Sequence, residues 1–129
     1  MKPKPKPSIV VFAKGIRKLA HFYQEVAEMS VAHADKGHIV LDQEGFQLVI
    51  HGIPTKIAAQ IQITEPPQIR ENTPIKPCLP VASIDSARLR AAELGGSVGP
   101  KSQEWEARGF RACDGHDPEG NVFQVREGA

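Results

Sequence analysis

The stretch from Asp114 to Arg126, DGHDPEGNVFQVR, decides the fold of this chain. Its central part, Asp117–Asn121, is dense in turn-forming residues: a proline presets its own φ angle, a glycine supplies a positive φ, and the flanking Asp and Asn can bond back to nearby backbone. The residues that follow alternate, because Phe123 and Val125 fall on one face and Gln124 on the other. The stretch therefore predicts a hairpin turn followed by a half-buried strand.

The composition is that of a globular protein with nearly balanced charge. The chain has 129 residues, enough for one domain with a modest core, and 40% of them are hydrophobic and 24% charged. Sixteen Lys and Arg residues against fifteen Asp and Glu residues give a net charge of +1. This balance offers no electrostatic footprint for a nucleic acid or a membrane surface, so neither is expected as a partner.

Hydrophobic runs and cysteines indicate the compartment. No apolar run reaches the length of about 18 residues that a membrane span needs. The N-terminus lacks the hydrophobic core of a signal peptide, so we expect the protein in the cytoplasm. Cys78 and Cys113 are far apart in the sequence. In a reducing cytosol we expect them as buried free thiols rather than as a disulfide.

The first half of the chain begins with a tail and continues as one strand, one helix and three strands. Residues 1–7 alternate Lys and Pro and predict a flexible, extended tail, since proline cannot donate to a sheet. Residues 8–52 form the first predicted module. Its expected elements are a strand at Ser8–Ala13, a helix at Ile16–Met29, and strands at Ser30–Ala34, His38–Asp42 and Phe46–His51.

The second half repeats that order after a linker. Residues 53–74 contain four prolines and predict a crossover between the halves. Residues 75–127 form the second predicted module. Its expected elements are an edge strand at Ile75–Ala82, a helix at Ile84–Leu94, and strands at Ser97–Gly99, Glu104–Ala107, Gly109–Cys113 and Asn121–Arg126.

The two modules can be aligned as an internal repeat. The helices begin at Ile16 and Ile84, so the first strands and helices are offset by 68 residues. The last hairpins align with an offset of 75, which matches Phe46 to Asn121. The additional residues fall in turns of the second half. The sequence thus predicts one α+β domain, residues 1–129, made of two βαβββ modules.

Three pieces of the sequence carry a resemblance to a known family. His21-Phe22-Tyr23 matches the end of its first helix, Glu93-Leu94-Gly95-Gly96 the end of its second helix, and Asp117–Asn121 its last turn. In this order they resemble the vicinal oxygen chelate superfamily, which includes glyoxalase I, extradiol dioxygenases, and bleomycin and fosfomycin resistance proteins. The resemblance implies strands that close around a cup-shaped cavity, and a homodimer.

The resemblance also implies where a metal ion would bind. In the metalloenzymes of the superfamily, ligands come from the first and last strands of each module. The matching positions here are Ser8, Val49, Lys76 and Gln124. None is His, Glu or Asp, and the Lys76 charge opposes a cation, so we expect no metal and no other cofactor in the cup. His51 lies one alternation beyond Val49, but one histidine with one glutamine is not a metal site.

The expected site is therefore a cup for a small organic molecule. Alternation directs Phe12, His51 and Gln124 into the cup. Trp105 can stack on a flat ligand, or pack in the core or at a dimer interface, and Arg111 can clamp an anion. His33, His38 and His116 are expected at turns on the surface.

Three functions fit this sequence. The first is metal-independent binding of a small organic molecule, as the resemblance to bleomycin resistance proteins implies. The alternative is a metal-dependent lyase or dioxygenase of the same superfamily with an atypical site, so enzymatic activity stays open. The third is a structural or regulatory module without a ligand pocket.

Overall fold

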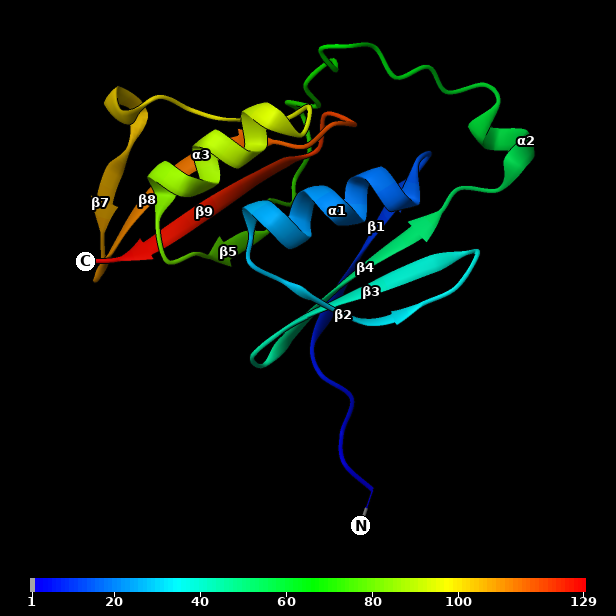
Figure 1. The fold of residues 1–129 in the computed structure, drawn as a ribbon, viewed down its shortest axis with the longest axis horizontal. Helices are drawn as coiled ribbons and strands as arrows, with labels where there is room; N and C mark the ends of the chain where they lie inside the picture. Colours follow the sequence, from blue (N-terminus) through cyan, green and yellow to red (C-terminus); the bar gives the residue numbers. More distant parts are fainter. Residues whose placement is uncertain (1) are drawn as a thin grey trace.

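The computed structural model describes residues 2–129 as two halves with the same order of elements (Figure 1). The first half consists of β1 (Ser8–Ala13), α1 (Ile16–Val26), β2 (Ser30–Ala34), β3 (His38–Gln43) and β4 (Phe46–Gly52). The second half consists of β5 (Cys78–Pro80), α3 (Ile84–Glu93), β6 (Ser97–Val98), β8 (Phe110–His116) and β9 (Val122–Gly128). Three short elements lie outside this repeat: α2 (Thr55–Ala58) in the linker, the 3₁₀ turn η1 (Lys101–Gln103) and β7 (Trp105–Ala107).

Each half forms its own mixed sheet. The strand order is β1-β4-β3-β2 in the first sheet and β5-β9-β8-β6 in the second, with β7 also paired to β8. In each sheet the first strand of the module pairs in parallel with its last strand, and the remaining pairs are antiparallel. The predicted α+β fold of two βαβββ modules is confirmed.

The repeat offsets are consistent with the strand registers. Val10 pairs with Val49 in the first sheet, and Cys78 pairs with Gln124 in the second. Adding 68 to Val10 gives Cys78, and adding 75 to Val49 gives Gln124, so the two offsets taken from the sequence relate the two parallel pairs.

The core lies between the helices and one face of each sheet. Figure 1 shows α1 and α3 side by side, and both helices contact strands of their own sheets. Leu48 and Ile50 of β4 are fully buried on this face, as are Phe123 and Val125 of β9. Because side chains alternate along a strand, the residues between them lie on the opposite face, which the helices do not cover. We call this the open face of each sheet.

The last turn of the second half is bound to the first half. The Glu119 carboxylate accepts hydrogen bonds from the backbone N–H groups of Lys14 and Gly15, both at 2.8 Å. Gly15 precedes the first residue of α1 and has no capping side chain of its own. Glu119 therefore takes the place of a local cap and brings a negative charge to the N-terminus of the helix.

Several element boundaries differ from the predictions. Helix α1 ends at Val26 instead of Met29, because Glu28 adopts a positive φ of 57°. Strand β5 covers only Cys78–Pro80, although the Pro77 carbonyl still accepts a hydrogen bond from the Gln124 N–H. Proline has no N–H of its own to donate, so the ladder cannot extend further towards the linker. Strand β8 is longer than predicted and reaches His116.

The cysteines and the N-terminal tail also bear on the predictions. Cys113 is buried, as expected, but Cys78 is exposed.

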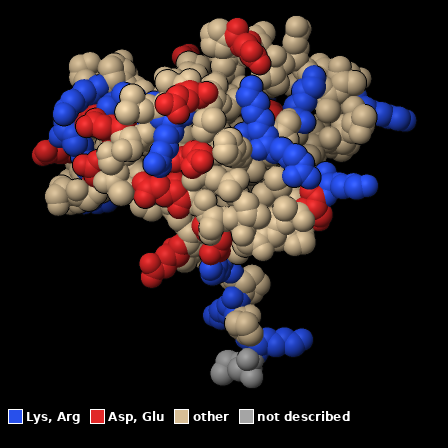
Figure 2. Space-filling view, in the orientation of Figure 1, with Lys and Arg blue, Asp and Glu red and all other residues tan. Residues whose placement is uncertain are grey.

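Flexibility was expected for residues 1–7, of which Met1 lies outside the described residues. Lys6 forms an ion pair with Asp42 at 2.9 Å. In Figure 2 the tail extends away from the body, and acidic and basic side chains are interspersed over the visible face. Within residues 2–129, no helix is long and apolar enough to cross a membrane.

Candidate functional site

Four rings form a row across the open face of the first sheet. His33 and His38 have ring centroids 5.1 Å apart, His38 stacks on His51 at 5.9 Å and 19°, and Phe12 meets the edge of His51 at 5.7 Å. The four residues come from β2, β3, β4 and β1 respectively. We call this set the histidine row. It places the predicted site residues Phe12 and His51 side by side, as their direct pairing across β1 and β4 requires.

A contact with the neighbouring backbone sets the tautomer of His51. Its Nδ1 lies 2.9 Å from the backbone oxygen of Gly52. Since a carbonyl oxygen only accepts, the proton is assigned to Nδ1. The Nε2 atom is then an acceptor that can receive a hydrogen bond from a ligand.

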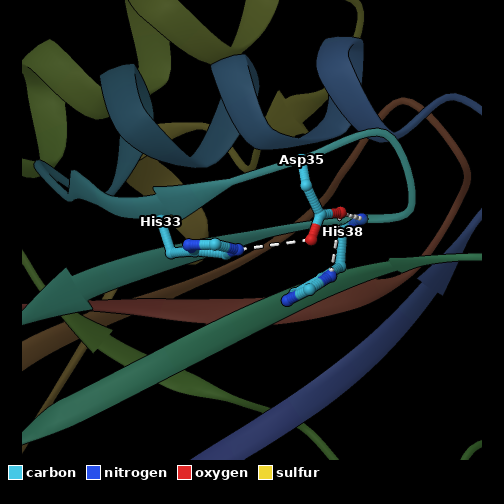
Figure 3. Close-up of side chains that lie close together, drawn as sticks. All are labelled: His33, Asp35 and His38. Atoms are coloured by element: carbon cyan, nitrogen blue, oxygen red, sulfur yellow. Dashed lines mark hydrogen bonds and ion pairs between the residues drawn. The ribbon is translucent and has the colours of Figure 1, made fainter.

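The β2–β3 hairpin brings His33, Asp35 and His38 together (Figure 3). Asp35 Oδ2 lies 3.2 Å from His33 Nε2, and Asp35 Oδ1 lies 3.1 Å from His38 Nδ1. Asp35 Oδ1 also accepts the backbone N–H groups of Gly37 and His38 at 2.8 and 2.9 Å. These backbone bonds are the main reason why the pKa of Asp35 falls to about 2.

A chain of polar contacts lies on the open face of the second sheet. The Lys76 ammonium is 2.9 Å from Asp114 Oδ2, and Gln124 donates from Nε2 to Asp114 Oδ1 at 3.1 Å. Arg126 donates from Nε to the Gln124 side-chain oxygen at 2.7 Å, and its guanidinium lies 4.3 Å above the Phe110 ring. Gln124, which is only 6% exposed, is thereby bonded at both ends of its amide.

The residues at the four positions that the resemblance matches to metal ligands do not fit a divalent metal ion. They offer a hydroxyl, an alkyl group, an ammonium and an amide, from Ser8, Val49, Lys76 and Gln124. A divalent ion needs carboxylate, imidazole or thiolate donors, usually about three from the protein in an open site. The Lys76 ammonium is itself the cation that the Asp114 carboxylate binds.

Arg111 is placed differently from the prediction. It lies on the helix-facing side of β8, the same side as the buried Cys113. There its guanidinium contacts Glu104 at 2.6 Å and Glu106 at 3.1 Å. Arg88 of α3 binds the other Glu104 oxygen, and the hydrogen bonds from Arg88 and Arg111 lower the pKa of Glu104. Arg111 therefore belongs to a partly exposed ion-pair network around the buried Glu104 carboxylate and not to the open face.

Trp105 lies at the far side of the second sheet. It pairs with Ala112, which shares the open face with Asp114, and it is 40% exposed. His116, at the end of β8, contributes to a shallow hollow with Gly99 and Gln103. Neither residue lies in the histidine row.

A cavity of about 320 Å³ lies where β1 faces the linker and the start of β9. We call it the seam cavity. Its lining is mostly apolar and includes Phe12 as the one predicted site residue. The other principal lining residues are Val10, Arg70, Ile75, Pro77 and Val122. Its volume is at the lower end of the range of about 300–1,000 Å³ that is usual for small-molecule pockets.

Two parts of the site were missed from the sequence. Asp114 was not recognised as the partner of Lys76 and Gln124, although it alternates correctly with Ala112 along β8. His33 and His38 were expected as separate surface residues. The pattern His-x-Asp-x-x-His across a turn was the available signal, but it becomes a cluster only through the register of the hairpin.

Comparison with known proteins places the fold. One similar structure is a glyoxalase/bleomycin resistance protein/dioxygenase family enzyme from Burkholderia phytofirmans PsJN, with TM-score 0.67, 18% identity, and coverage of 95% of this chain and 97% of that one. Another is the fosfomycin resistance protein FosX from Mesorhizobium loti, with TM-score 0.64, 11% identity, and coverage of 100% and 95%. A mutant FosX from Listeria monocytogenes, in complex with Mn(II) and 1S,2S-dihydroxypropylphosphonic acid, gives TM-score 0.65, 15% identity, and coverage of 100% and 93%.

These identities are low enough that the structural similarity concerns the fold alone. The comparison with curated proteins gave no match. The family model of the glyoxalase-like domain matches residues 8–126, which is nearly the whole chain. The resemblance to the vicinal oxygen chelate superfamily is confirmed, and the protein belongs to the glyoxalase-like domain family.

Proposed function

We propose that this chain binds a small organic molecule and that binding does not require a metal ion at the family's ligand positions. The observation that carries the proposal is the contact between Lys76 and Asp114 at 2.9 Å. The resemblance matches Lys76 to a position where the superfamily's metalloenzymes have a metal ligand, and the contact with Asp114 holds its positive charge in place. A second cation beside Lys76 would be repelled, while an organic ligand with acceptor groups would find donors there.

The seam cavity and the neighbouring open face provide the surface for such a ligand. Phe12 is 59% exposed and lines the cavity together with the exposed Val10 and Ile75, and a group of exposed apolar side chains of this kind often marks a binding site. His51 lies 5.7 Å from Phe12 and presents an acceptor nitrogen. Gln124 is the corresponding polar group on the second sheet. The ligand chemistry that fits is a small, partly flat molecule with an apolar body and hydrogen-bonding groups at its ends.

The active form in this proposal is a homodimer. Strand β2 is the outer strand of the first sheet, and all five of its residues are exposed. Val31 and Val10 add apolar surface, at 46% and 48% exposure. Unpaired sheet edges and exposed apolar side chains are the features that a second copy of the chain would cover.

A thermal-shift screen of tag-free protein against small metabolites and antibiotics tests the proposal. A ligand that binds only the folded state raises the melting temperature. Trp105 is the only tryptophan, so its fluorescence reports whether the second sheet takes part. The shift should persist after the protein has been treated with a chelator.

Two variants make the screen specific. Phe12→Ala should abolish or strongly reduce the ligand-induced shift. Leu89→Ala, on the exposed side of α3 at 68% exposure, is the matched apolar control and should leave it unchanged. A shift that disappears on chelation, returns with added metal and does so equally in His33→Ala would contradict the proposal and favour the metal-dependent alternative.

A further inference from the structure

The β2–β3 hairpin carries three donor groups that the proposed function does not use. We propose that His33, Asp35 and His38 form a binding site for one divalent transition metal ion of the zinc class. Within the described residues 2–129, this is the group of three His, Cys, Asp or Glu side chains whose ligand atoms all lie within 4.8 Å of one another. Figure 3 shows the Asp35 carboxylate between the two imidazoles.

A shift in strand register puts His33 on the same face as His38. Val31 pairs with Leu41, but His33 pairs with Val40, so Ala32 is the additional residue. In a regular ladder His33 would lie opposite Ile39, which is buried on the helix side. The irregularity instead directs its imidazole to the open face. Bulges of this kind often occur beside functional sites, where they redirect a side chain.

The turn fixes the Asp35 carboxylate. Its Oδ1 atom accepts two backbone N–H groups, from Gly37 and His38, and its Oδ2 atom contacts His33 at 3.2 Å. The carboxylate therefore has Oδ1 held by the backbone and close to the His38 ring, and Oδ2 directed towards His33. A metal ion at Oδ2 leaves both backbone hydrogen bonds intact. The turn thus supplies the outer support that a metal-binding carboxylate normally needs.

His38 is held by its neighbours on the other side. Its ring stacks on His51 at an angle of 19°, and the side chain is 33% exposed. His51 cannot turn freely, because its own Nδ1 bonds to the Gly52 oxygen. Two of the three ligands are thus restrained before a metal binds, which lowers the entropy that binding must overcome.

The donor spacing suits a small tetrahedral ion. Zinc bonds of about 2.0–2.2 Å at tetrahedral angles place neighbouring donors about 3.3–3.5 Å apart. Asp35 Oδ2 lies 3.2 Å from His33 Nε2, which is already near this value, while the 3.1 Å contact of His38 is made to the other oxygen, Oδ1. The remaining separation between the imidazoles lies within 4.8 Å, and rotation of the exposed His33 side chain can shorten it.

The donor set selects the class of ion. Two imidazole nitrogens and one carboxylate oxygen suit Zn²⁺, Ni²⁺ and Cu²⁺, whereas Mg²⁺ and Ca²⁺ require more oxygen ligands. Three protein ligands leave a fourth position for water or for a donor atom of another molecule. That position opens on the face of the histidine row, next to His51. The site is separate from Ser8, Val49, Lys76 and Gln124, so it does not depend on the proposed function.

A zinc titration of tag-free protein tests the proposal. Competition with a chromophoric zinc indicator should show one Zn²⁺ per chain. NMR spectra of the imidazoles should show His33 and His38 as the rings whose signals change most. His33→Ala and His38→Ala should each reduce zinc affinity by at least about tenfold, since loss even of outer-shell partners costs about 10–100-fold. Asp35→Asn keeps an acceptor for the turn but removes the negative charge, and it should weaken binding as well.

Matched controls separate the hairpin from other sites. His21→Ala removes an exposed histidine from α1 and should leave zinc affinity unchanged. Circular dichroism of each variant checks that the fold is retained, and His33→Gln replaces His33→Ala if it is not. The proposal is overturned if no zinc binds, or if His21→Ala weakens binding as much as the hairpin variants do. If zinc binding is lost in a Gln124 variant but not in the hairpin variants, the ion binds at the family's ligand positions. That result would overturn this proposal and would also contradict the proposed function.

Discussion

Tyr23 and Asp117 join the two halves of the molecule through a buried hydrogen bond. The Tyr23 hydroxyl donates to Asp117 Oδ2 at 2.6 Å, and the two residues are 2% and 0% exposed. Burial raises the pKa of Asp117 and raises the pKa of Tyr23 well above its ordinary value, with the Asp117 charge as a further cause for Tyr23. Asp117 Oδ1 also accepts the backbone N–H groups of Glu119 and Asn121. The turn that decides the fold in the sequence is therefore also the joint between helix α1 and the last hairpin.

Removing the Tyr23 hydroxyl should destabilise the protein. Tyr23→Phe keeps the ring packed against Phe22 and Phe123 but leaves the buried Asp117 carboxylate short of one donor. A hydrogen bond to a charged group of this kind contributes about 1–3 kcal/mol to the free energy of unfolding. Urea denaturation at neutral pH measures the loss, with His21→Ala as the surface control on the same helix. A loss no greater than that of the control would contradict this account of the joint.

The Glu119 carboxylate should act as a helix cap supplied from a distance. Glu119→Ala removes the acceptor for the Lys14 and Gly15 N–H groups and should lower the free energy of unfolding by about 1–2 kcal/mol. Glu93→Ala, at the exposed end of α3, is the matched carboxylate control. Because Glu119 and Asp117 lie in one turn, the double variant with Tyr23→Phe should be non-additive. Strictly additive losses would show that the two contacts act independently.

The faces of β4 and β9 could be predicted from the sequence, and the prediction is confirmed. Each strand has apolar residues at every second position on one face, and Leu48, Ile50, Phe123 and Val125 are buried beneath the helices. A period of two fixes the face of every residue once one side is apolar. The inward placement of Gln124 followed from that rule alone.

Arg111 shows where such reasoning ends. Strand β8 has mixed chemistry on both faces, so its alternation does not indicate which side is buried. Glu104 is the first residue of the strand predicted just before β8, but its contact with Arg111 depends on the register of β7 against β8, which the sequence pattern does not fix. The histidine row was missed for a similar reason, since the register shift at Ala32 has no glycine or proline to announce it.

The oligomeric state can be measured directly. We expect a homodimer in solution, because the outer edge of β2 and the exposed Val10 and Val31 side chains remain without cover in a single chain. Light scattering coupled to size-exclusion chromatography should give twice the chain mass of 14.1 kDa. Val31→Lys places a charge at the β2 edge and should shift the equilibrium towards monomer. A monomer for the unaltered chain at micromolar concentration would refute the dimer.

The Asp35 turn predicts a defined pH dependence. Its pKa is lowered from 3.8 to about 2, mainly by the backbone N–H groups of Gly37 and His38. The pKa of Asp35 is lower in the folded protein than in the unfolded chain. The ionised carboxylate therefore stabilises the folded turn at pH values above the pKa of the unfolded chain. This contribution is lost as the pH falls towards about 2. In NMR titrations the Asp35 carboxyl signal and the Gly37 and His38 amide signals should share a midpoint near 2. In Asp35→Asn the Gly37 and His38 amide signals should no longer change near pH 2. An Asp35 midpoint near the ordinary pKa of 3.8 would contradict the turn geometry.

Replacing Gln124 should affect ligand binding more than stability. Gln124→Leu removes its hydrogen bonds with Asp114 and Arg126. Asp114 is exposed and keeps its ion pair with Lys76, and Arg126 is half-buried beside Phe110, so water can replace the lost contacts. The free energy of unfolding should therefore change by no more than about 1 kcal/mol, in contrast to the buried joint at Asp117.

The ligand that raises the melting temperature of the unaltered protein should bind Gln124→Leu more weakly, because the second sheet then lacks an amide at its centre. Gln47→Leu is the matched control: it removes a comparable bond, from Gln47 to Asp42 at 3.2 Å, on the open face of the first sheet. It should leave ligand affinity unchanged, since Gln47 pairs with Ser8, at the other end of β1 and β4 from Phe12 and His51. Isothermal titration of both variants measures the difference. Unfolding of Gln124→Leu, or equal weakening in both variants, would show that Gln124 supports the sheet and does not orient the ligand.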